Sequence, residues 1–116
     1  MSRIIIEAHS TYDAEDSTIA LLKGGFVAQK ARITYNLSRG LPTIERYSEY
    51  PLILEGYMNN LDMNIYVYSV TAGYGGTGPN TLVRILKEAG FKFDTQDILT
   101  DRLADTFGQI KLELNN

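Results

Sequence analysis

Residues 71–86, TAGYGGTGPNTLVRIL, hold four glycines and a proline between a tyrosine-rich apolar run and a helical pattern. Within this stretch residues 73–78 match G-x-G-x-x-G, a pattern in which glycines bring the backbone close to a pyrophosphate at a helix N-terminus. Asp94 and Asp97 follow roughly where a dinucleotide fold places its ribose-binding acid, about 20 residues on. Only 25 residues (92–116) come after Phe91, too few to complete a doubly wound sheet. A dinucleotide-binding dehydrogenase is therefore not expected.

The same stretch also differs from the phosphate-binding loop of nucleotide hydrolases. That loop needs a lysine and then a serine or threonine directly after its last glycine, because the lysine contacts the phosphates and the hydroxyl binds magnesium. Here Gly78 is followed by Pro79 and Asn80, which fit neither role. The sequence thus excludes nucleotide hydrolysis by this route.

A simpler role remains for the glycine-rich stretch, which is to bind an anion at a helix start. Gly75, Gly76 and Gly78 permit positive φ and let a ligand approach the backbone closely. Pro79 and Asn80 are suited to begin a helix, whose unpaired N–H groups and dipole favour negative charge. The alternative is a glycine-rich corner between a strand and a helix with no ligand, and both interpretations stay open.

Charged and flat side chains near this stretch suit a nucleotide. Arg84, one turn into the expected helix, is placed to donate a charge-assisted hydrogen bond to a phosphate. Tyr74 at the tip of the loop, with Tyr66 and Tyr68 nearby, offers rings that stack on a base. These residues favour the binding of a small nucleotide over a ligand-free corner.

Groups for catalysis or metal binding are scarce. There is no cysteine, and His9 is the single histidine, so neither a disulfide framework nor an ordinary zinc site is expected. His9 has Ser10 and Asp13 close in sequence, but triad partners are recognised by geometry and not by spacing. Solvated helix faces explain the acidic pairs at helical spacing, Asp13/Asp16, Asp94/Asp97 and Asp101/Asp105. No catalytic residue, metal ligand or cofactor is predicted, and this favours a binding protein.

Composition and charge restrict the class of protein. The length fits one domain over residues 1–116, and 44% hydrophobic with 22% charged residues indicates a globular chain. A net charge of -3 and a pI of about 5.0 argue against polymeric nucleic acid as a partner. The start, MSRIIIEAHS, has too short an apolar run for a signal peptide or a membrane span. A cytosolic location without membrane association is expected.

Alternation and helical periodicity predict a small single α+β domain with a mostly antiparallel sheet and two or three helices. The expected strands cover residues 3–8, 26–38, 52–55, 64–71 and 109–114. The expected helices cover residues 11–23 and 80–91, with a short third helix within 95–107 that Thr95 caps. Asn59 and Asn60 predict a turn, and Gly90 predicts a left-handed helix end.

The segment YGGTGPNTLVRILKEAGF (74–91), after a tyrosine-bearing strand in a small acidic chain that begins MSRIIIEAHSTYD, resembles the phage-encoded Thoeris anti-defence sponges. The resemblance implies a non-enzymatic homo-oligomer in the host cytosol. Its implied ligand is a cyclic ADP-ribose-type signal from a bacterial TIR-domain defence enzyme, held uncleaved at a subunit interface; some members bind cyclic oligonucleotides. A short chain has little interior for a deep pocket, which also favours a ligand buried between subunits.

The candidate ligand-binding residues follow either from position or from chemistry alone. Those in or after the glycine-rich stretch are Tyr74, Gly75, Gly76, Gly78, Asn80, Thr81 and Arg84. Those suggested only because phosphates need cations are Arg39, Arg46 and Arg102. Two other functions stay open, a small phosphodiesterase-like enzyme that degrades such a nucleotide and an interaction protein whose loop binds no ligand.

Overall fold

The computed structural model describes residues 2–7, 10–37 and 50–116. Its elements in chain order are β1 (Ser2–Ile6), α1 (Thr11–Lys23), β2 (Val27–Asn36), β3 (Leu52–Met58), β4 (Leu61–Val67), α2 (Thr77–Glu88), α3 (Gln96–Leu99) and β5 (Gln109–Asn115). The five strands form one sheet in the order β1-β4-β3-β2-β5. Neighbouring strands are antiparallel except β1 and β4, which are parallel. The predicted small α+β fold with a mostly antiparallel sheet is confirmed.

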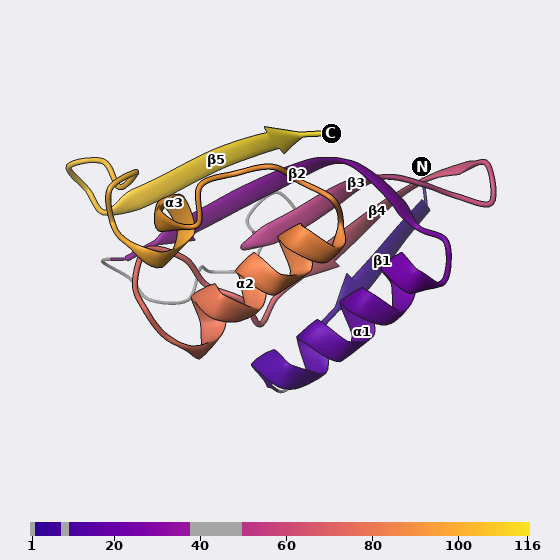
Figure 1. Ribbon diagram of the computed structural model, residues 1–116, viewed down its shortest axis with the longest axis horizontal. Helices are drawn as coiled ribbons and strands as arrows, with labels where there is room; N and C mark the ends of the chain where they lie inside the picture. The colour runs from indigo at the N-terminus through magenta and orange to yellow at the C-terminus, as the bar shows by residue number, and fades with distance from the viewer. Residues whose placement is uncertain (1, 8–9, 38–49) are drawn as a thin grey trace.

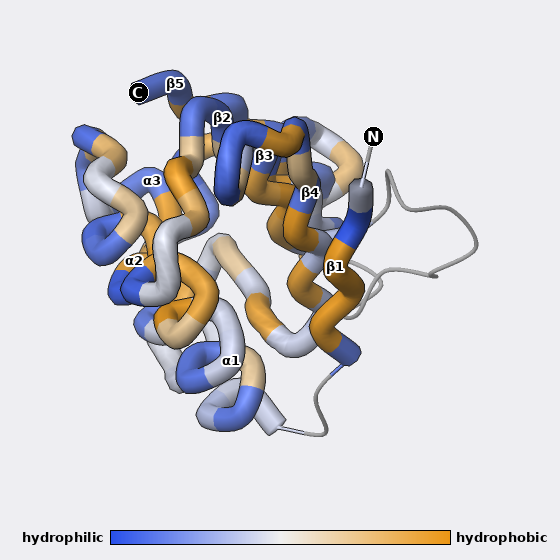
Figure 2. The backbone as a smooth tube through the Cα atoms, turned by 90° about the vertical axis from the view of Figure 1, so that its right-hand side faces the viewer, coloured by the Kyte–Doolittle hydropathy of each residue, from blue (hydrophilic) through white to orange (hydrophobic). Residues whose placement is uncertain are grey.

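The helices lie on one face of the sheet, where α1 and α2 run side by side (Figures 1 and 2). Alternate strand residues point to that face and form the main core, in which Ile33, Leu54 and Ile65 are buried. The intervening residues point to the opposite face, which no helix of the described residues covers (Figure 1). There Tyr66 packs with Ile53 in a second, smaller apolar cluster.

The hairpin between β3 and β4 forms where the sequence predicts a turn. Asn59 and Asn60 have φ of 51° and 65°, the left-handed conformations that a tight two-residue hairpin turn requires. The strand expected over 64–71 begins earlier, at Leu61, and ends at Val67. Val67 pairs with Leu52, the first residue of β3, so the residues beyond it lack a β3 neighbour.

The helix ends agree with the predicted caps in two of three cases. Helix α1 has the predicted bounds, and the Ser10 hydroxyl accepts a hydrogen bond from the Asp13 N–H at 3.1 Å. Helix α2 begins at Thr77, earlier than predicted, and Gly90 with a φ of 88° follows its C-terminus as expected. Thr95 takes the predicted N-cap position of α3, but its side chain makes no capping bond. The Asp94 carboxylate accepts from the Gln96 N–H instead, at 2.9 Å.

Replacing Gly56 by alanine is expected to destabilise the sheet. A Cβ there would lie 1.9 Å from the Val27 carbonyl oxygen, beside the irregular register between Ala28 and Lys30. The free energy of unfolding should fall by about 1–3 kcal/mol in urea denaturation, the usual cost of overpacking. Gly75→Ala is the control, because a Cβ at Gly75 has nothing within 4 Å. Equal stability of the two variants would contradict the close strand approach.

Candidate functional site

Two glycines of the glycine-rich stretch are required for packing. Gly73 has a φ of 97°, and a Cβ there would lie 2.6 Å from the Ile110 side chain. Gly78 lies in the first turn of α2, where a Cβ would lie 2.0 Å from the Thr71 hydroxyl oxygen. Gly75, Gly76 and Gly78 permit positive φ but do not adopt it, and within this stretch only Gly73 does. Gly78 therefore brings the helix against Thr71.

The open part of the stretch is the backbone from Gly75 to Thr77. A Cβ at Gly75 would meet nothing within 4 Å, so this backbone is accessible. Gly76 is the N-cap of α2 and makes no side-chain capping bond, and the first turn contains no acidic residue. The first N–H groups of a helix have no partner within it, and because Pro79 has no N–H, these donors in α2 are the N–H groups of Thr77 and Gly78. They lie at the positive end of the helix dipole.

Asn80 supports this helix start from one turn further on. Its backbone N–H donates to the Gly76 carbonyl oxygen at 3.0 Å, and its side-chain amide donates to the same oxygen at 2.8 Å. Both bonds hold the Gly76 peptide in place. In the structure Asn80 thus orients the backbone of the site, while its predicted direct contact with a ligand stays a prediction.

Tyr74 lies beside this helix start. The edge of its ring is 3.0 Å from the position of a Gly76 Cβ, and its hydroxyl is hydrogen-bonded to that of Thr71 at 2.7 Å. Tyr35 of β2 is close to this pair. Burial raises the pKa of the Tyr35 hydroxyl, and the proximity of Tyr74 raises it further. The Tyr74 ring, 42% exposed, is therefore a fixed flat surface next to the open backbone.

Tyr66 and Tyr68 do not join Tyr74 in the predicted way. Tyr66 belongs to the cluster on the sheet face without helices, with its ring centroid 5.7 Å from that of Tyr50. The Tyr68 ring packs edge-on against Tyr50 at 6.4 Å. Because Tyr66 points away from α2, the expected group of three tyrosines around one base is not formed.

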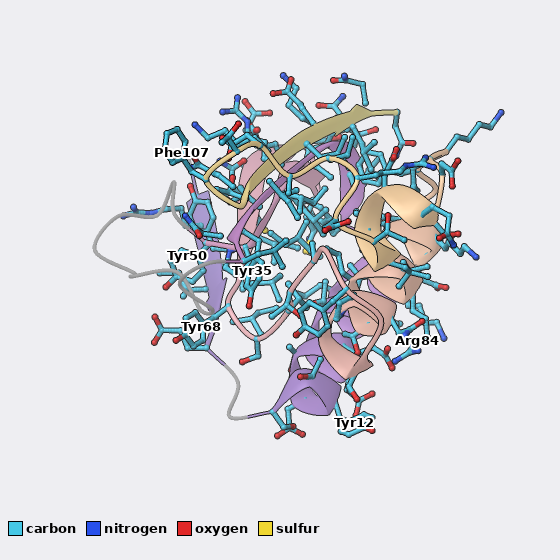
Figure 3. All side chains as sticks on the ribbon, turned by 90° about the vertical axis from the view of Figure 1, so that its left-hand side faces the viewer. Tyr12, Tyr35, Tyr50, Tyr68, Arg84 and Phe107 are labelled. Carbon is cyan, nitrogen blue, oxygen red and sulfur yellow. The ribbon has the colours of Figure 1, made fainter. Side chains whose placement is uncertain are left out.

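The predicted arginines have acidic partners where the structure describes them. The Arg84 guanidinium pairs with Glu15 of α1 and donates to the hydroxyl of the buried Thr81 at 3.1 Å. Figure 3 shows Arg84 on the side of the molecule away from Tyr35, Tyr50 and Tyr68. Arg102 contacts Asp94 at 2.8 Å and Asp97 at 2.6 Å. Arg39 and Arg46 lie outside the described residues.

The described part of the chain contains no candidate metal site. No group of three or more histidine and acidic side chains is placed there to hold a metal ion. His9 lies outside the described residues. None of the described helices is long and apolar enough to cross a membrane.

Sequence reasoning missed Thr71 and Tyr35. Thr71 contacts both Gly78 and Tyr74. Tyr35 belongs to β2, which is distant in sequence from the glycine-rich stretch. A threonine seven residues before a glycine carries no recognisable pattern, and Tyr35 is expected only as a member of a half-buried strand. Their role follows from tertiary contacts alone.

The Asp94 carboxyl is expected to titrate below the usual aspartate range. The hydrogen bond from the Gln96 N–H is the largest cause of its lowered pKa, and the bond from Arg102 is the second. This carboxylate therefore stabilises the fold above the unfolded aspartate pKa of about 3.9. That contribution is lost as the pH falls through the lower folded-state pKa.

Carboxyl NMR titration of the wild type and of Arg102→Ala checks this arrangement. The substitution should raise the Asp94 pKa only in part, because the stronger bond from Gln96 remains. A wild-type pKa in the ordinary range, or full recovery of that range in the variant, would show that these bonds are not kept in solution.

Comparison with known proteins gives no relative. No protein-family model, no curated protein and no solved structure matches this chain. The resemblance of residues 74–91 to the anti-defence sponges consequently stays a prediction.

Proposed function

We propose that this protein binds a small phosphate-bearing nucleotide, of the cyclic ADP-ribose or cyclic-nucleotide type, at the start of α2 and sequesters it without cleavage. The supporting observation is the open, uncapped backbone from Gly75 to Thr77. Helix α1 of the same chain differs, because Ser10 caps it and Asp13 occupies its first turn. As a sponge for an immune signal, the protein would counter bacterial anti-phage defence.

Electrostatics favour a phosphate at this position. A helix N-terminus carries about half a positive charge, and its unpaired N–H groups point along the axis toward an anion. Although the chain as a whole has a net charge of -3, the start of α2 is locally positive and attracts small anions that fit against the backbone. The open space at Gly75 lets a phosphate reach these groups without moving a side chain.

Tyr74 adds a surface for the base of the nucleotide. Its hydroxyl is held by Thr71, which fixes the ring in one orientation before the ligand binds. A prearranged ring loses little conformational entropy on stacking, and stacking on a base contributes about 1–3 kcal/mol. A phosphate donor set and a fixed ring together suit a nucleotide better than free phosphate.

The same surroundings favour holding the ligand over cleaving it. Thr71, Tyr74 and Asn80 offer hydroxyl and amide groups, which are weak general bases at neutral pH, and the backbone from Gly75 to Thr77 offers N–H groups, which only donate. The raised pKa of Tyr35 keeps its hydroxyl protonated at neutral pH. A phosphodiesterase-like enzyme remains the alternative that the first experiment tests.

Incubation with a cyclic ADP-ribose isomer should deplete the nucleotide from solution, and heating should release it intact. Mass analysis of the released material distinguishes binding from turnover. A thermal-shift screen with cyclic ADP-ribose isomers and cyclic dinucleotides identifies the preferred ligand, because a ligand at about 100 times its dissociation constant adds about 2.7 kcal/mol of stability. Recovery of a cleaved product would show an enzyme, and no shift with any nucleotide would favour the interaction protein.

Gly76→Asp is expected to abolish nucleotide binding with little net change in stability. Its Cβ would lie 3.0 Å from the Tyr74 ring and shift that ring slightly, a contact that the Gly76→Asn control shares. Gly76 has an extended backbone that any residue adopts, with φ of 172°, and aspartate there would cap α2 and occupy the anion position. The dissociation constant of the nucleotide should rise at least about tenfold, because two negative groups compete for the same N–H donors. Calorimetric titration measures it, and urea denaturation measures stability.

Gly76→Asn is the matched control for charge. Asparagine caps a helix about as well as aspartate but carries no charge. It should weaken binding less than Gly76→Asp does, at similar stability. Unchanged affinity in both variants would place the nucleotide elsewhere.

A further inference from the structure

Strand β1 lies at the rim of the sheet, and among the described residues it has a neighbouring strand, β4, on one side only (Figure 1). Figure 2 shows it as a hydrophobic stretch with hydrophilic segments at both ends. The Ile5 side chain is 39% exposed, and Arg3 and Glu7 on either side of it are exposed as well. An exposed apolar edge strand is a template for pairing with another chain.

The hydrogen bonds of β1 show which of its backbone groups face outward. In a parallel pair, every second residue directs both its N–H and its C=O toward the neighbouring strand. The Ile6 carbonyl oxygen accepts from the Tyr68 N–H at 3.1 Å, so Ile6 faces β4. By alternation, the backbone groups of Arg3, Ile5 and Glu7 are directed away from β4.

We propose that β1 pairs with β1 of a second copy of this chain, antiparallel and centred on Ile5. Ile5 then lies opposite Ile5 of the partner subunit, and Arg3 lies opposite Glu7 of the partner subunit. These are the residues whose backbone groups point outward, so they meet as hydrogen-bonded pairs with about six main-chain bonds. The segment is self-complementary about Ile5, because each arginine meets a glutamate across the two-fold axis.

Apolar side chains continue across this junction. Ile5 pairs with Tyr66, and Tyr66 pairs with Ile53, so one row crosses three strands on the face without helices. Pairing of two β1 strands joins this row to the same row of the partner subunit. Glu7 is held on this face by the Tyr50 hydroxyl, which donates to it at 2.6 Å, and a carboxylate accepts further donors.

The other rim of the sheet is less suited to pairing. On β5 the side chains at the matching positions are Lys111 and Glu113, both exposed and charged, and Lys30 already contacts Glu113 at 3.1 Å. Charged side chains, lysine above all, protect edge strands from association. Exposed ion pairs also stabilise little, whereas Ile5 adds apolar burial. The β1 rim is therefore the interface, and one strand makes it a small one.

Charge exchange tests the register by sedimentation equilibrium in the absence of nucleotide. The wild type should form dimers. Arg3→Glu and Glu7→Arg should each raise the dimer dissociation constant about tenfold or more, because like charges replace both ion pairs. An equimolar mixture of the two variants should form heterodimers, since every pair is then complementary. Far-UV circular dichroism checks that each variant is folded.

Lys111→Glu is the matched control, since it places like charges in a β5 pairing and leaves β1 unchanged. It should dimerise like the wild type. A monomeric wild type, single variants that dimerise normally, or a mixture that stays monomeric would each overturn the proposal, and so would loss of dimers in Lys111→Glu alone. Since this dimer needs no ligand, its failure and the failure of nucleotide binding are separate results.

Discussion

Helix α2 buries half of its twelve residues against the sheet, and its first turn reaches that position because Gly78 has no side chain to strike Thr71. Buried side chains such as Leu82 and Ile85 each contribute about 1.5–3 kcal/mol. A glycine in place of a capping side chain costs only about a few tenths of a kcal/mol, so the burial of α2 outweighs the lack of a side-chain cap at Gly76. Thr71 links the two effects, since the hydroxyl that Gly78 approaches also fixes Tyr74. Core packing and the orientation of the candidate site thus depend on one contact.

Local patterns predicted the elements well and their roles less well. The bounds of α1, the closing strand β5 and the turn at Asn59–Asn60 follow from caps, alternation and turn chemistry within a few residues. The end of β4 depends on where β3 begins, and the pairing of Arg84 depends on Glu15 in another helix. Such partners are distant in sequence, so no local pattern contains them.

The glycine-rich stretch illustrates the same limit at the site. Its composition correctly predicted a loop before a helix. It did not predict the structural role of each glycine. Gly73 and Gly78 are needed for contacts with Ile110 and Thr71, Gly76 lies against the Tyr74 ring, and Gly75 has open space around it. A sequence motif treats these glycines alike. Only their tertiary surroundings show which of them pack against a neighbour and which leave the backbone accessible to a ligand. Two of the three glycines that match the motif, Gly73 and Gly78, are therefore explained by packing.

The parallel pairing of β1 with β4 also has a consequence for how the chain folds. Ser2 pairs with Met63, so α1, β2 and β3 all separate β1 from the strand that it needs. Contacts of such high sequence separation form late, because the loop must be closed before they stabilise anything. During synthesis residues Ile4–Ile6 leave the ribosome long before β4, so β1 initially has no strand to pair with. Until β4 is made, the three isoleucines that complete the sheet are exposed to contacts with other chains.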